Sequence, residues 1–157
     1  MTSQLREQII ETLQLTQRQI SELLASVAAD QDWQPAPEQW SFRYIAAHLA
    51  TVEKECFQDR LRQIAAGGQP YFEYYLNSGR DFSRMELMES LRDWAVTRQE
   101  NIEFVRDLTE EQWALAGVHE TFGPMTVLDA LKVMADHDQE HWQELVELLA
   151  DYRSRTH

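Results

Sequence analysis

The stretch TVLDALKVMADHDQEHWQELVEL, residues 126–148, decides the fold. Its apolar residues recur at helical spacing, and one stripe combines them with two histidines: Ala130, Met134, His137, His141, Leu145 and Leu148. This pattern predicts a long helix whose buried face carries both histidines. Imidazoles at positions i and i+4 lie one turn apart on the same face, where they can bind one metal ion. A third ligand would have to come from another element.

A third histidine lies on a second apolar stripe. In WSFRYIAAHLATVE, residues 40–53, His48 lies three residues after Ile45 and so joins the same inward face. A single histidine in such a stripe is usually a core residue with one hydrogen bond, and that interpretation stays open. Three buried imidazoles without partners would each cost roughly 1 to 3 kcal/mol, however, whereas a shared metal satisfies one nitrogen on each. His119, in a Gly-flanked loop, and His157, the last residue, are expected to be solvated.

Length and composition indicate one intracellular domain. A chain of 157 residues can bury a full core in a single domain spanning 1–157. Its only cysteine, Cys56, cannot form an internal disulfide, and its apolar stripe predicts an inert buried thiol in a reducing cytoplasm. No signal-peptide pattern opens the chain and no run of about 18 apolar residues occurs, so neither secretion nor membrane insertion is expected.

The charge balance argues against nucleic acid as a partner. Fourteen Lys and Arg against 27 Asp and Glu give a net charge of −13, which would repel a polyanion. The arginines are scattered among acidic residues and form no basic patch in the sequence.

Helical spacing, caps and breakers predict an all-α protein with no confident strand. The expected helices cover residues 3–29, 42–66, 84–107 and 126–151, with caps at Ser41, Ser83 and Thr126 and a stop at Gly67-Gly68. The stretch DQDWQPAPEQW, residues 30–40, predicts an ordered loop pinned by its tryptophans. A long crossover links the second and third helices, and the loop LAGVHETFGPMT, residues 115–126, allows a hairpin-like excursion. A four-helix bundle is the economical way to bury four such stripes.

Several of these pieces, taken in order, resemble the DinB-like domain family, a metal-binding four-helix-bundle family that includes thiol-dependent transferases of bacteria. The likeness covers most of the chain, from the second helix to the end of the fourth. The matching residues are Trp40-Ser41, Ala-Ala-His48-Leu, Glu53, Gly123, Met125-Thr126, His137-Asp138 and His141-Trp142. The resemblance implies an up-down-down-up bundle with a divalent metal held by His48, His137 and His141.

Three histidine ligands leave a metal with an open position, which is typical of catalytic sites. The resemblance implies a transferase in which the metal activates a low-molecular-weight thiol against a small electrophile, with bacillithiol, mycothiol or glutathione as candidate thiols. A metal-dependent hydrolase is an alternative, because a bound water can be acidified to a pKa of about 7. Histidine ligands suit Zn, Ni, Fe and Mn, so the identity of the metal stays open.

Carboxylates near the histidines in the sequence are the candidate catalytic groups. Glu53 and Asp138 could orient a ligand imidazole or accept a proton, and the alternative is that they are surface or interhelical charges. Arg98 interrupts the stripe of the third helix and is expected to extend from the core edge towards solvent, and the alternative is that it faces a substrate anion. At least one of Trp40, Tyr71 and Trp142 is expected to wall a pocket over the metal.

A function of a different class is a non-catalytic, metal-containing module that binds a ligand or forms a homodimer. Apolar residues outside the main stripe of the first helix, Ile10, Leu15 and Leu23, add surface that such a dimer could bury.

Overall fold

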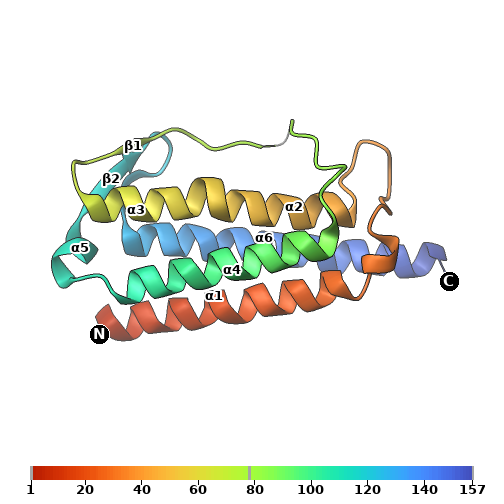
Figure 1. Ribbon diagram of the computed structural model, residues 1–157, viewed down its shortest axis with the longest axis horizontal. Coiled ribbons are helices and arrows are strands. Elements are labelled where there is room, and N and C mark those ends of the chain that lie inside the picture. Colours follow the sequence, from red (N-terminus) through yellow and green to blue (C-terminus); the bar gives the residue numbers. More distant parts are fainter. Residues whose placement is uncertain (1, 78, 157) are drawn as a thin grey trace.

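The computed structural model describes residues 2–77 and 79–156, and four long helical segments dominate it (Figure 1). These segments are α1 (Thr2–Ala25), the continuous run of α2 (Phe42–Val52), η2 (Glu53–Phe57) and α3 (Gln58–Ala66), then α4 (Leu87–Arg106) and α6 (Val127–Thr156). The predicted four-helix bundle is therefore confirmed. None of the described helices combines the length and the apolar character that a bilayer crossing requires.

Several predicted caps are present. The Ser41 side chain accepts a hydrogen bond from the backbone N–H of Tyr44 at the start of α2, and Gly67 ends α3 with φ of +85°. At the start of α6, the Thr126 hydroxyl accepts from the N–H of Asp129 at 3.1 Å, while the Asp129 carboxylate accepts from the N–H of Thr126 at 3.0 Å.

Three predicted boundaries were wrong. The fourth helix continues to Thr156 instead of ending at about residue 151. The first helix ends at Ala25, and a short 3₁₀ turn, η1 (Ala28–Asp30), continues the chain towards the loop. The third helix begins at Leu87 because Glu86, and not Ser83, is its cap: the Glu86 carboxylate accepts from the N–H of Glu89 at 2.9 Å.

The proline-rich loop at residues 30–40 is ordered by aromatic packing, as predicted. The ring of Trp33 stacks on Phe42 at 5.7 Å between centroids and meets Tyr152 edge-on at 5.2 Å. At the other end of the loop, Trp40 lies 4.8 Å from the ring of His48. The loop thereby places an aromatic side chain beside a predicted metal ligand.

A small sheet corrects the expectation that no confident strand would form. Strand β2 (Ala116–His119) pairs antiparallel with β3 (Gly123–Thr126), which confirms the hairpin-like excursion. Strand β1 (Tyr71–Phe72), from the crossover, pairs parallel with β2. A two-residue strand shows no period of its own, so its formation depends on the hairpin beside it. The sheet and the short helix α5 (Glu110–Ala114) lie at one end of the bundle (Figure 1).

The core consists of two apolar clusters. One cluster, at the sheet end, includes Leu13, Ile102 and Met134, and the other includes Ile20, Trp94 and Leu145. On each of three helices a polar residue lies between the residues of the two clusters. These polar residues are Thr16 on α1, Arg98 on α4 and Asp138 on α6. The polar residues form a layer across the middle of the bundle, and the predicted metal ligands belong to it.

Candidate metal centre

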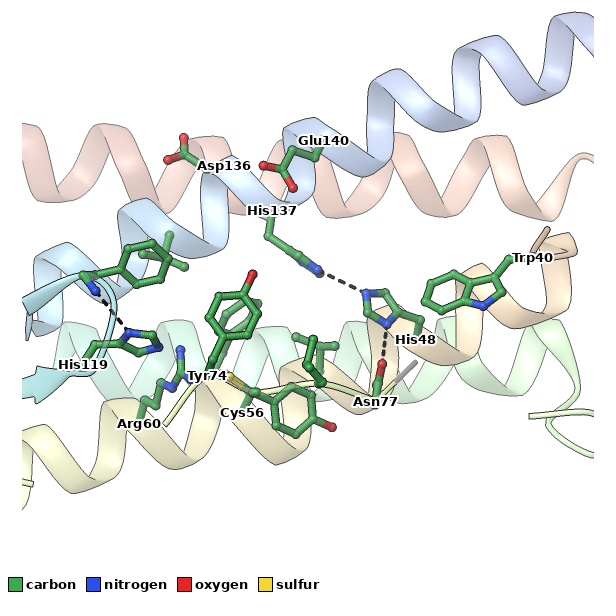
Figure 2. A pocket seen from close by; sticks show the side chains of 16 residues that line it. Trp40, His48, Cys56, Arg60, Tyr74, Asn77, His119, Asp136, His137 and Glu140 are labelled. Atoms are coloured by element: carbon green, nitrogen blue, oxygen red, sulfur yellow. Dashed lines mark hydrogen bonds between the residues drawn. The ribbon is translucent and has the colours of Figure 1, made fainter. Parts of the chain in front are cut away.

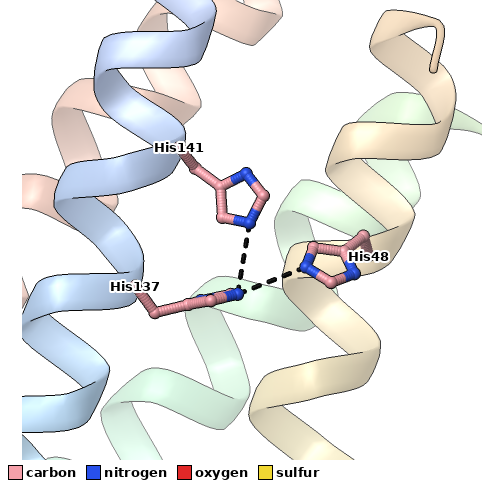
Figure 3. Close-up of side chains that lie close together, drawn as sticks. All are labelled: His48, His137 and His141. Atoms are coloured by element: carbon pink, nitrogen blue, oxygen red, sulfur yellow. Dashed lines mark hydrogen bonds between the residues drawn. The ribbon is translucent and has the colours of Figure 1, made fainter. Parts of the chain in front are cut away.

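His48, His137 and His141 converge in the middle of the bundle, one from α2 and two from α6 (Figure 3). The Nε2 atom of His137 lies 3.2 Å from Nε2 of His48 and 3.1 Å from Nε2 of His141. Nitrogens bound to one zinc ion at about 2.0 to 2.1 Å in tetrahedral geometry lie roughly 3.3 Å apart. The three side chains can therefore hold one metal ion between them.

A hydrogen-bond chain from the crossover fixes the orientation of the His48 ring. The side-chain amide of Asn77 donates to Oγ of Thr51 at 2.9 Å, which leaves the Asn77 carbonyl oxygen facing Nδ1 of His48 at 2.8 Å. That oxygen can only accept, so Nδ1 of His48 carries the proton. The Nε2 lone pair of His48 is consequently free to bind a metal. Asn77 was missed by the sequence analysis because it lies in a segment without periodicity.

Burial keeps the three imidazoles neutral at physiological pH. The pKa of His137 is lowered to about 4 and that of His141 to about 3, chiefly by desolvation and to a smaller extent by the neighbouring histidines. Burial also lowers the pKa of His48, although the contact with Asn77 opposes that shift. A metal ion can thus bind without first displacing protons from its ligands.

The outer nitrogens of the two α6 histidines are less well satisfied. Within the described residues, Nδ1 of His137 and Nδ1 of His141 are buried and lack a hydrogen-bond partner. An oxygen of Glu144 lies 3.8 Å from Nδ1 of His141, beyond hydrogen-bond distance. These two histidines are held mainly by packing on α6.

Two members of the triad, His48 and His137, line a pocket of about 520 Å³ between α2–α3, the crossover and α6, whereas His141 is not part of its wall (Figure 2). Its walls are largely aromatic and aliphatic, and Trp40 is part of them, as expected, whereas Tyr71 and Trp142 do not line it. Two carboxylates from α6, Asp136 and Glu140, also line the pocket. Neither was expected from the sequence, although Asp136 lies one residue before His137 and Glu140 lies three residues after it.

The carboxylates singled out from the sequence lie elsewhere. Glu53 and Asp138 are 0% and 1% exposed, and both bind the guanidinium of Arg98, at 2.7 and 2.8 Å. The expectation that Arg98 extends towards solvent was wrong, because the two carboxylates compensate its charge inside the core. Asn101 and the indole N–H of Trp94 donate to Glu53 as well.

Two other residues also line the pocket. Cys56 is buried, as predicted, and desolvation raises its pKa to about 11, so its thiol stays protonated. The expectation of a solvated His119 was wrong: it is only 1% exposed, since Tyr74 and Phe122 pack around its ring. His157 lies outside the described residues.

The fold and the histidine site together place the protein in the class of helical bundles that have a candidate metal centre between two helices. Residues 7–145 match the sequence pattern of the DinB superfamily, and the chain belongs to that family. No curated protein matches the chain at a significant level.

A solved structure with the same fold is YfiT from Bacillus subtilis, described as a probable metal-dependent hydrolase with an unusual four-helix bundle topology. The two chains superpose with a TM-score of 0.77 at 16% identity, and the match covers 96% of this chain and 87% of YfiT. At this level of identity the likeness concerns the fold.

Proposed function

We propose that His48, His137 and His141 bind one divalent metal ion and that the protein uses it to activate a small nucleophile in the adjoining pocket. The observation that carries this proposal is the convergence of three Nε2 atoms beside a pocket of about 520 Å³, which His48 and His137 line. A closed structural site would need a fourth protein ligand, and three histidines with a pocket beside them favour an open one. Zn, Ni, Fe and Mn all suit this ligand set.

In the proposed reaction, the sulfur of a low-molecular-weight thiol forms a bond to a carbon of a small electrophile, and the leaving group of that carbon departs with the electron pair of the broken bond. When bound, the metal would supply positive charge that keeps a coordinated thiol deprotonated at neutral pH. The aromatic walls would exclude water from the electrophile, and Glu140 or Asp136 would accept the released proton at a carboxylate oxygen. Glu53 and Asp138 are less suitable for this role, because Arg98 binds both.

A metal-dependent hydrolase is the second candidate. It is favoured by the similarity to YfiT, whose description names that class of activity. The same residues would serve, with water in place of the thiol as nucleophile.

The decisive experiment combines metal analysis with a substrate panel. Protein purified without an affinity tag is loaded with Zn, Ni, Fe or Mn. The amount of bound metal is then measured and compared with the amount bound by the His48→Ala and His137→Ala variants. Chromogenic electrophiles are then tested with bacillithiol, mycothiol, glutathione or water alone. We expect one equivalent of metal in the native protein only, and turnover that needs both metal and thiol. Turnover without thiol would favour the hydrolase.

Metal binding without turnover of any substrate would favour the non-catalytic module instead. Light scattering over a range of concentrations would then test whether that module forms a homodimer. Of the residues expected to add apolar surface on α1, Leu15 is exposed, whereas Ile10 is buried in the core and Leu23 packs against it, so the surface available to a dimer is smaller than expected.

The up-down-down-up order of the helices is proposed on the same family basis. It is supported by the course of the crossover, which carries the chain back along the bundle before α4 begins (Figure 1). The single-domain organisation over residues 1–157 is likewise proposed, since the family match spans most of the chain.

A further inference from the structure

The pocket has a second polar end, away from Trp40 and His48, where Arg60 and His119 lie (Figure 2). Arg60 comes from α3 and His119 from the last position of β2. Neither residue takes part in the histidine cluster or in the core salt bridges. These two side chains could therefore bind a ligand group independently of the metal.

Arg60 is a buried cation without a matching anion. The residue is only 7% exposed, and no carboxylate of the described residues lies within ion-pair distance of its guanidinium. One amino group donates to the backbone oxygen of Glu73 at 3.1 Å, and the guanidinium carbon lies 5.6 Å from the ring centroid of Phe72. Burying an unpaired charge is costly, in contrast to the fully paired Arg98 of the same protein.

His119 presents a second unused donor beside it. The backbone N–H groups of Thr121 and Phe122 both donate to Nδ1 of His119, at 3.0 and 3.2 Å. Nδ1 must then be the unprotonated nitrogen, and Nε2 carries the hydrogen. Within the described part of the chain, this Nε2 is buried and lacks a partner.

Sheet pairing places the two donors next to each other. Phe72, over which the guanidinium of Arg60 lies, is paired in register with His119 across β1 and β2. Paired residues in a sheet present their side chains on the same face. The proximity of the positive charge of Arg60 also adds to the lowering of the pKa of His119, which burial causes in the first place. His119 is thus a neutral donor at physiological pH.

We infer that Arg60 and His119 form a subsite for the carboxylate of an elongated, largely apolar small molecule whose other end lies at the histidine triad. The guanidinium supplies the charge and at least one hydrogen bond, and Nε2–H of His119 supplies another once the ligand's oxygen displaces the side chains that cover it. The apolar body would lie along Phe57 and Val133, which also line the pocket. The position of the ligand's other end at the triad rests on the proposed function, whereas the binding of its carboxylate by Arg60 and His119 does not.

The test uses metal-free protein, so that it does not depend on the metal. Binding of 4-phenylbutanoate and of its uncharged analogue 4-phenylbutanamide is measured by NMR titration. We expect the acid to bind at least about tenfold more tightly than the amide, because a charge-assisted pair is added. Equal affinities for the acid and the amide would overturn the inference, and this comparison needs no variant.

Two substitutions test whether the preference for the acid comes from Arg60 and His119. In Arg60→Gln and in His119→Phe, the preference for the acid should fall to within about twofold. Arg62→Gln, which removes an exposed arginine from the same helix, is the matched control and should keep the full preference. Persistence of the preference in a folded Arg60→Gln protein would also overturn the inference. Zinc uptake, measured separately on each protein, reports on the triad, so a failure of the metal site and a failure of this subsite remain distinguishable.

Discussion

At the residue scale, the three histidines are stabilised as neutral groups, and this makes the stability of the metal-free protein depend on pH. The pKa values of His137 and His141, about 4 and about 3, lie below the ordinary value of 6.5 that the unfolded chain would show. Between those values the unfolded chain binds more protons than the folded one. The stabilisation is therefore complete above pH of about 6.5 and is lost as the pH falls towards about 4.

We predict that the free energy of unfolding of metal-free protein, from urea titrations, falls steadily over that window. Carboxylates contribute to any loss below about pH 5, so a His137→Gln/His141→Gln variant is the reference. The variant should lose less stability between neutral and mildly acidic pH than the native protein. Identical pH profiles would show that the imidazoles are not buried as described.

Asn77 is the residue that most directly tests the orientation of a ligand ring. Its carbonyl oxygen holds the proton on Nδ1 of His48, so Asn77→Ala should weaken metal binding, by about 10- to 100-fold as for other groups that orient metal-bound histidines. Asn77→Asp keeps an acceptor at the same place and should retain most of the affinity. Competition with a fluorescent chelator measures both. Equal metal affinities in the native protein and in Asn77→Ala would show that Asn77 does not orient the His48 ring for metal binding.

At the element scale, Arg98 joins the two helices that carry the proposed metal ligands. Its guanidinium, on α4, binds Glu53 in the run of α2 and Asp138 on α6, and it also donates to the backbone oxygen of Leu13 on α1. Glu53 follows His48 on the same helical run, and Asp138 is the neighbour of His137. The ion pair thereby fixes the relative position of the two ligand-bearing helices.

We predict that Arg98→Met lowers the free energy of unfolding by about 3 to 5 kcal/mol, because two buried carboxylates are left without their cation. Replacing all three charges, in Glu53→Met/Arg98→Met/Asp138→Leu, should recover most of that loss. Urea unfolding followed by circular dichroism measures both variants. A triple variant no more stable than Arg98→Met would contradict this explanation.

The elements also show what the sequence could and could not predict. Stripes and caps predicted the four helices, and the inward position of His48, His137 and His141 followed from the same stripes. The π-helical segment Glu53–Phe57 was not predictable, because one extra residue in a helical turn leaves no pattern in residue type. Asn77, Arg60 and His119 were missed for another reason. Asn77 lies on the crossover and His119 on the sheet, and Arg60, on α3, meets the sheet at Phe72, so the position of each depends on contacts between distant parts of the chain.

At the scale of the whole molecule, the net charge of −13 determines how metal binding has to be tested. An acidic surface attracts divalent cations without specificity, so a rise in stability on adding metal is not by itself evidence for the triad. A specific ion differs because it bridges α2 and α6 in the folded state only. The amount by which such an ion raises the free energy of unfolding depends on its free concentration relative to its dissociation constant.

We therefore predict that zinc at about 100 times its dissociation constant raises the free energy of unfolding by about 2.7 kcal/mol. For a domain of this size, that corresponds to a rise in the melting temperature of roughly 5 to 10 °C. The control is a variant with His48, His137 and His141 all replaced by Ala, which keeps the acidic surface and should show a much smaller rise. Calorimetric melting of both proteins, with and without zinc, measures the difference. An equal rise in the two proteins would mean that the surface carboxylates, and not the convergent imidazoles, bind the ion.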